Sequence, residues 1–199
     1  MATSFQMIRD EELKAIVKLV SAALDQLRIP YLIGGSVASS IRGIPRSTHD
    51  VDFVARVFPQ QAEALAAALG SDFHADPPYM RRQMEAGRAF NVIQISTALK
   101  VDIFAAKDEF HLAQLERATM APMAHIGDTA EYPFATAEDV ILAKLHWYRI
   151  GGEVSTQQWN DLTDVIAVNP SLDRDYLDLW AARLGVAGLL EKAFAAVDL

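Results

Sequence analysis

The sequence contains no cysteine. A disulfide framework, a thiol nucleophile and a cysteine metal site are therefore excluded for this chain. Basic residues are also scarce, because 18 lysines and arginines face 26 aspartates and glutamates, which gives a formal net charge of -8. Proteins that hold a long nucleic acid by bulk charge rely on an excess of lysine and arginine. We do not expect that mode of binding here, whereas small charged substrates fit the composition.

Long apolar runs are absent as well. No run is long enough to cross a bilayer, and the polar first 14 residues lack the basic and then apolar layout of a signal peptide. We expect a cytoplasmic protein with no membrane partner. With 51% hydrophobic residues, a chain of 199 residues can bury a substantial core, which favours a folded protein over disorder.

Helix and strand patterns alternate along the first two thirds of the chain. The spacing predicts helices over residues 10–27, 36–41, 59–69 and 107–119, and strands over residues 31–33, 51–57, 90–95 and 100–104. Two further short strands, over residues 123–126 and 132–135, are expected to pair around Gly127. The rest is predicted to be helical, with capping boxes that start helices at Thr136 and Ser155.

These elements predict an α+β fold, in which helices flank a mixed β-sheet and a helical region follows at the C-terminal end. We expect a core over residues 1–135, including the N-terminal helix, and a helical annex over residues 136–199 that packs on it. The two parts form either separate domains or one continuous domain.

Three aspartates lie in apolar, β-prone stretches: Asp50, Asp52 and Asp102. Successive side chains of a strand alternate faces, so Asp50 and Asp52 point the same way. A buried carboxylate without a cationic partner costs several kcal/mol, and Mg²⁺ prefers hard oxygen ligands of this kind. If the strand of Asp102 is a neighbour, the three carboxylates converge. We therefore predict a metal site at these aspartates.

A glycine turn at Gly34, Gly35 and Ser36 separates a predicted strand from a predicted helix. Glycines permit close backbone approach, and the free N–H groups at a helix start attract an anion. The Ser36 hydroxyl can donate to a phosphate oxygen, and Arg42 and Arg46 can add positive charge between the turn and the aspartates. A phosphate cradle beside metal-binding carboxylates favours phosphoryl or nucleotidyl transfer.

The order of these motifs resembles the DNA polymerase β-type nucleotidyltransferase superfamily. Its pattern of a GG or GS turn, an hDhD strand and a third h[DE]h strand is similar to Gly34-Gly35-Ser36, Asp50-Val51-Asp52-Phe53 and Val101-Asp102-Ile103. The resemblance covers roughly residues 30 to 104. Residues 137–145 and 161–166 are similar to looser C-terminal motifs of small bacterial nucleotidyltransferases, including the AbiEii-like group of type IV toxins.

The resemblance implies an enzyme that uses two Mg²⁺ ions, or Mn²⁺ in their place, to move an NMP from an NTP such as ATP to a hydroxyl, with release of pyrophosphate. It implies that Asp50 and Asp52 bind both ions. It also implies that Asp102 completes the coordination of one ion and helps to activate the acceptor hydroxyl. The residues implied to bind the nucleotide phosphates are Gly34, Gly35, Ser36, Arg46 and Lys144. The acceptor class, whether a small molecule, a protein or an RNA end, stays open.

Two alternatives accompany this prediction. Lys144 lies in an otherwise apolar helix, where it either contacts phosphate or pairs with Asp161 or Asp164. The whole chain is either the enzyme described above or a catalytically silent nucleotide-binding or regulatory module, such as one component of a toxin-antitoxin pair.

Overall fold

The computed structural model describes residues 4–48 and 50–197, and the side chains of residues 9–48 and 50–197. The described chain divides into two compact units. Unit 1 comprises Met1–Ile33 and Ser47–Phe134, and unit 2 comprises Gly34–Arg46 and Ala135–Leu199. The predicted division into a core over residues 1–135 and a helical annex over residues 136–199 stays a prediction about domains. The segment 34–46 belongs to unit 2.

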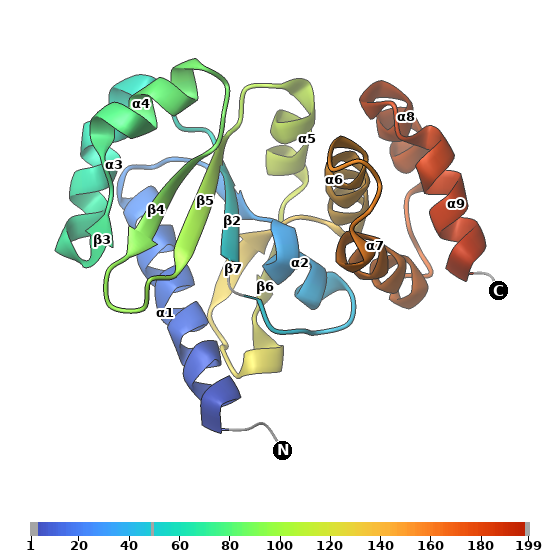
Figure 1. Cartoon of the computed structure of the whole chain (residues 1–199), viewed down its shortest axis with the longest axis horizontal. Coiled ribbons are helices and arrows are strands. Elements are labelled where there is room, and N and C mark those ends of the chain that lie inside the picture. Colours follow the sequence, from blue (N-terminus) through green and yellow to red (C-terminus); the bar gives the residue numbers. More distant parts are fainter. Residues whose placement is uncertain (1–3, 49, 198–199) are drawn as a thin grey trace. The chain divides into compact units, whose positions relative to one another are not determined.

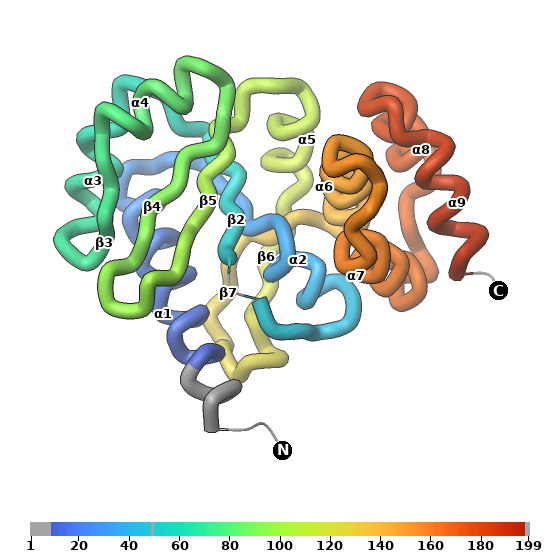
Figure 2. The backbone as a smooth tube through the Cα atoms, in the orientation of Figure 1, coloured from blue at the N-terminus to red at the C-terminus, as the bar shows by residue number. Residues whose placement is uncertain are grey.

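Within the residues that the structure describes, unit 1 holds a seven-stranded mixed sheet in the order β3-β4-β5-β2-β1-β7-β6 (Figure 1). The strands are β1 (Tyr31–Ile33), β2 (Asp50–Ala55), β3 (Phe73–His74), β4 (Phe90–Gln94), β5 (Lys100–Ala105), β6 (Thr119–Pro122) and β7 (Glu131–Phe134). β2 runs parallel to β5 and antiparallel to β1, and β4 pairs antiparallel with β5. The tube in Figure 2 follows the tight connection from β4 to β5.

One face of this sheet is covered by helices. Unit 1 contains α1 (Ser4–Gln26), α3 (Ala62–Leu69), α4 (Pro77–Glu85) and α5 (Glu109–Arg117), with 3-10 turns η1 (Pro59–Gln61), η2 (Gly70–Asp72) and η3 (Ala124–Ile126). In Figure 1, α1 lies behind β4 and β5. The buried residues include Ile16, Val17, Val20, Leu24, Phe53, Leu65, Met80, Met84, Phe90 and Ile103. Burial of this apolar surface is the main favourable contribution to the fold of unit 1.

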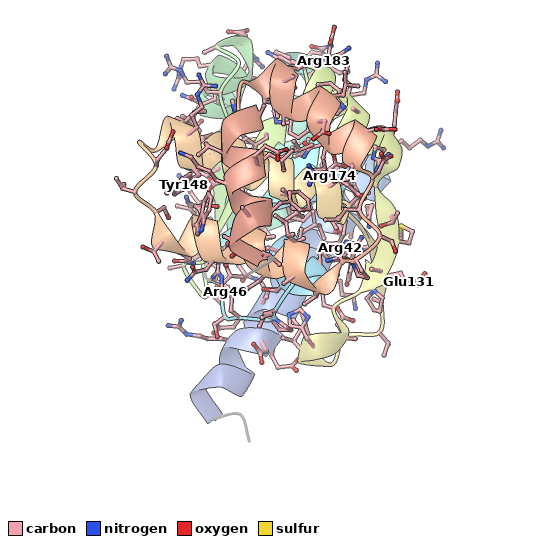
Figure 3. All side chains as sticks on the ribbon, turned by 90° about the vertical axis from the view of Figure 1, so that its right-hand side faces the viewer. Arg42, Arg46, Glu131, Tyr148, Arg174 and Arg183 are labelled. Carbon is pink, nitrogen blue, oxygen red and sulfur yellow. The ribbon has the colours of Figure 1, made fainter. Side chains whose placement is uncertain are left out.

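The regular elements in the described part of unit 2 are all helices. Its helices are α2 (Gly35–Arg42), α6 (Ala137–Ile150), α7 (Thr156–Val168), α8 (Arg174–Leu184) and α9 (Ala187–Val197). The side chains of Thr136, Ser155 and Asp173 accept hydrogen bonds from the backbone N–H groups of Asp139, Gln158 and Tyr176, and so cap α6, α7 and α8. Figure 3 shows Arg174 on α8, where its guanidinium lies 3.8 Å from the centre of the Phe194 ring on α9.

The structure confirms the predicted fold class, the strands at residues 31–33, 90–95 and 100–104, and the helix starts with N-caps at Thr136 and Ser155. Two expectations were wrong. The first helix begins at Ser4 and not at residue 10, and residues 124–126 form a 3-10 turn while the strand lies earlier, at Thr119–Pro122. No helix among the described residues is both long and apolar enough to cross a membrane.

Candidate active site

The three predicted carboxylates come together on one face of the sheet in unit 1. Asp52 of β2 is paired in register with Asp102 of β5, and Asp50 is paired with Lys100. Paired residues of adjacent strands have their side chains on the same face, about 5 Å apart. Asn91 of β4 lies opposite Asp102 from the other side. The condition on which the predicted convergence of the three carboxylates depended, that the two strands are neighbours, is therefore met.

The alternation of the strands explains why the acids are tolerated. Val51, Phe53, Val101 and Ile103 are buried and point to the opposite face, whereas Asp50 is exposed and Asp52 and Asp102 are only half-buried. The sequence suggested carboxylates deep in an apolar environment, and this was wrong. They line the face of the sheet that solvent reaches, where desolvation costs much less.

Lys100 supplies a cation at the same place. Its Nζ lies 2.7 Å from Oδ2 of Asp102. This hydrogen bond is the largest influence on the Lys100 ammonium and raises its pKa against the effect of partial burial, and the charges of Asp102, Asp50 and Asp52 raise it further. All three carboxylates therefore stabilise positive charge at the position of the Lys100 ammonium. In the sequence, only the spacing of the three aspartates along the strands indicated this.

The donor chemistry of this face fits a divalent ion. Asp50, Asp52 and Asp102 offer carboxylate oxygens, which are the ligands that Mg²⁺ and Mn²⁺ prefer. One cation already lies on this face, because Lys100 Nζ is 2.7 Å from Oδ2 of Asp102. Among the side chains of residues 9–48 and 50–197, no group of three or more histidine, aspartate and glutamate residues is assembled as a ready metal site.

A hollow of about 310 Å³ opens beside Asp50. It is bounded by the start of β2, the turn between β4 and β5, and one side of α1, with both acidic and basic groups in its wall. The residues that line it are Arg9, Glu12, Leu13, Thr48, Asp50, Thr97, Ala98, Leu99 and Lys100. A hollow of this kind suits a small polar molecule better than an apolar one.

The glycine turn begins unit 2. Gly34 precedes the first residue of α2, and Gly35 has a φ of 53°, in the left-handed region that glycine tolerates best. The backbone N–H of Ala38 donates to the carbonyl oxygen of Gly34, which closes the first turn of the helix. The predicted sequence of turn and helix start is confirmed, one residue earlier than expected. Binding of phosphate at this turn stays a prediction.

Arg46 and Lys144, the two cations that the sequence assigned to nucleotide binding, meet at Asp161 of α7. Arg46 donates two hydrogen bonds to Asp161, from Nε to Oδ1 and from Nη2 to Oδ2, each with a length of 2.7 Å. Lys144 Nζ donates to Oδ2 of the same carboxylate at 2.7 Å. Arg46 Nη2 also donates to the Ser36 hydroxyl oxygen over 2.7 Å. Lys144 reaches Gln158 Oε1 at 3.2 Å. Figure 3 labels Arg46 within this unit.

This contact answers one question that the sequence left open. Lys144 pairs with Asp161, and both side chains are nearly inaccessible, with 5% and 7% of their surface exposed. Burial by itself raises the pKa of the Asp161 carboxyl, but the hydrogen bonds from Arg46 and Lys144 outweigh it and lower the pKa. The hydrogen bond to Asp161 likewise raises the pKa of Arg46. A contact of Lys144 with phosphate stays a prediction.

The arrangement of the described chain matches nucleotidyltransferase folds. The structure is similar to that of the antibiotic-resistance factor ANT(2'')-Ia in solution, with a TM-score of 0.54 and 14% identity over 95% of this chain and 96% of that one. It is also similar to an antigenic nucleotidyltransferase-like protein from Paracoccidioides brasiliensis, with a TM-score of 0.53 and 19% identity over 94% and 93% of the two chains.

At these identities the likeness establishes the fold and leaves the activity to be argued from the residues. The mixed sheet with its flanking helices is thus a nucleotidyltransferase-like fold. No protein-family model matches the sequence, and no curated protein is significantly similar to it.

Proposed function

We propose that the protein is a metal-dependent nucleotidyltransferase, which moves an NMP from an NTP to a hydroxyl acceptor and releases pyrophosphate. The observation that carries this proposal is the pairing of Asp52 with Asp102 on adjacent strands, with Asp50 on the same face. Three carboxylates that stabilise one cationic position, on a nucleotidyltransferase-like fold, are the donor set that this chemistry requires.

In the reaction, the acceptor oxygen forms a bond to the α-phosphorus of the NTP, and the bond from that phosphorus to the bridging oxygen of the β-phosphate breaks. Pyrophosphate leaves with the bonding electrons, and the hydroxyl proton passes to solvent or to a carboxylate. When bound, Mg²⁺ or Mn²⁺ would neutralise phosphate charge and polarise the reacting oxygens. Asp50, Asp52 and Asp102 would hold the ions, and Lys100 would release Asp102 as they bind.

The phosphate-binding role of Gly34, Gly35, Ser36, Arg46 and Lys144 is part of the same proposal. A glycine with positive φ at the start of a helix exposes backbone N–H groups that attract an anion. The Ser36 hydroxyl oxygen accepts from Arg46, so its own hydrogen can donate to a phosphate oxygen. These contacts support a role for the turn in gripping the phosphates of the nucleotide.

For the acceptor, the hollow beside Asp50 favours a small polar molecule. Its volume of about 310 Å³ and its mixed charges suit a compound that carries several polar groups. The net charge of -8 argues in the same direction, because a long RNA would be repelled. The hollow has room for only one residue of a protein acceptor, or for one nucleotide at an RNA end.

Membership of the AbiEii-like group is a second, finer proposal. It is supported by the contact between Lys144 and Asp161, since both residues lie in the C-terminal motifs that resemble that group. Under this proposal the protein is one component of a toxin-antitoxin pair, and it either transfers nucleotides or has kept the fold as a silent nucleotide-binding module.

The test is to incubate the purified full chain with each of the four α-labelled NTPs, Mg²⁺ or Mn²⁺, and a cell extract, and to measure pyrophosphate release and the position of the label. We expect transfer with the wild-type protein and loss of at least about 100-fold in rate for Asp50→Asn and Asp102→Asn, because ligands that hold the metal ions are removed.

Asp72→Asn is the matched control, because Asp72 is an exposed acid of unit 1 outside the carboxylate face. Label in the small-molecule fraction would support a small acceptor, and label on protein or RNA would contradict that choice. Nucleotide binding without transfer would favour the silent module. If no NTP is bound or consumed under any of these conditions, the proposed function is wrong.

A further inference from the structure

The network around Asp161 extends the proposed function to a residue that neither the strand motif nor the glycine turn includes. We propose that Asp161 is a positioning residue, whose carboxylate fixes the guanidinium of Arg46 beside the Ser36 hydroxyl so that both can receive a nucleotide phosphate. The proposal rests on the proposed function, because it assigns a role in binding the NTP phosphates.

The geometry of the contact between Asp161 and Arg46 is the first support. Two parallel hydrogen bonds of 2.7 Å join Nε and Nη2 of Arg46 to the two oxygens of one carboxylate. Such a bidentate pair fixes both the position and the plane of the guanidinium, which a single contact would not do. With the plane fixed, Nη2 also lies 2.7 Å from the Ser36 hydroxyl oxygen. The carboxylate therefore determines where the arginine meets the glycine turn.

The surroundings of Asp161 make it a rigid support. It lies on α7 with 7% of its side chain exposed, and Lys144 of α6 holds its Oδ2 from a second direction at 2.7 Å. Arg46, in contrast, has 28% of its side chain exposed. A buried carboxylate fixed by two helices thus holds an arginine that a ligand can still reach. Holding the arginine in advance reduces the conformational entropy lost when phosphate binds.

The alternative role for this pair is purely structural, as a buried ion pair between elements of unit 2. The two roles differ in their effect on phosphate binding. Replacement of Asp161 by asparagine removes one negative charge and so makes the net charge of the phosphate-binding region more positive by one, so charge alone predicts tighter binding of an anion. A positioning role predicts weaker binding despite the added charge, because asparagine cannot accept both hydrogen bonds of the arginine fork.

The experiment measures the dissociation constants of pyrophosphate and of each NTP with Mg²⁺ by calorimetry, on folded full-length Asp161→Asn and wild-type protein. We expect binding to weaken roughly tenfold in the variant. In the transfer assay, KM for the NTP should rise by a similar factor, with a smaller change in kcat. Asp164→Asn, one turn further along α7, is the matched control and should bind as the wild type does.

Arg46→Lys is the second variant, and it tests the positioning role of Asp161 by itself if Asp161→Asn does not fold. Lysine keeps the charge but cannot form the bidentate contact, so we again expect roughly tenfold weaker binding with the fold intact. Wild-type or tighter binding in both variants, or in Arg46→Lys alone if the other is unfolded, would overturn the positioning role while leaving the proposed function standing. Failure of the wild-type protein to bind any NTP would overturn both.

Discussion

Because the carboxylate of Asp161 is buried, we expect Asp161→Asn to lower the free energy of unfolding much more than Lys144→Met does. Asp161 accepts three hydrogen bonds, two from Arg46 and one from Lys144, all of 2.7 Å. Asp161→Asn leaves the ammonium of Lys144 buried beside an amide, and loss of one partner of a buried ion pair costs about 3 to 5 kcal/mol. Lys144→Met leaves the carboxylate bound to Arg46 and fills the same space, so we expect a loss of about 1 kcal/mol or less.

The double variant gives the sharper test. In Lys144→Met/Asp161→Asn the buried ammonium is gone, and we expect this protein to be more stable than Asp161→Asn by at least about 1 kcal/mol. Urea unfolding followed by circular dichroism measures these differences, and the melting temperature of Asp161→Asn should fall by about 10 °C. Asp164→Asn should stay within about 0.5 kcal/mol of the wild type. A double variant less stable than Asp161→Asn would refute the reasoning.

Two further predictions concern charge. Lys100→Met removes the cation that competes for Asp102 and should tighten Mn²⁺ binding, measured by electron paramagnetic resonance without substrate, by up to about fivefold; unchanged or weaker binding would contradict the role given to Lys100. The lowered pKa of Asp161 means that its ionised form stabilises the fold above the unfolded pKa of about 3.9, and that this stability is lost as the pH falls through the lower folded pKa. The stability difference between wild type and Asp161→Asn should therefore shrink below about pH 4 in urea titrations, and a difference that is constant down to pH 2 would show that the carboxylate is not held ionised.

The sequence predicted the carboxylate face because its determinants are local. Strand alternation put Asp50 and Asp52 on one face, and the apolar residues between them identify the buried side. The predicted caps at Thr136 and Ser155 were correct for the same reason, since a capping box involves only four consecutive residues.

The elements that were missed lack such local signals. Helix α4 buries only Met80 and Met84 and begins with two prolines, so its apolar periodicity is weak. β3 has two residues, which is too short to alternate. The contact of Arg46 with Asp161 joins residues 115 positions apart, and a single sequence offered Asp161 only as a partner for Lys144. Lys100 lies two residues before Asp102 on β5, so strand alternation places both on one face, but the proximity of Asp50 to Lys100 depends on the register between β2 and β5.

The assignment of residues 34–46 to unit 2 has a consequence for the order of synthesis. This segment leaves the ribosome between β1 and β2, long before the helices that it contacts in unit 2 have been made. Arg42 donates to the carbonyl oxygen of Ala135, and Asn169 donates to that of Arg42, so α2 can make these contacts only after residues 135–169 emerge. At ordinary translation rates that delay is on the order of ten seconds. During that interval the strands on either side of the segment can pair. The glycine turn and Arg46 can make their contacts within unit 2 only after the C-terminal helices have been synthesised.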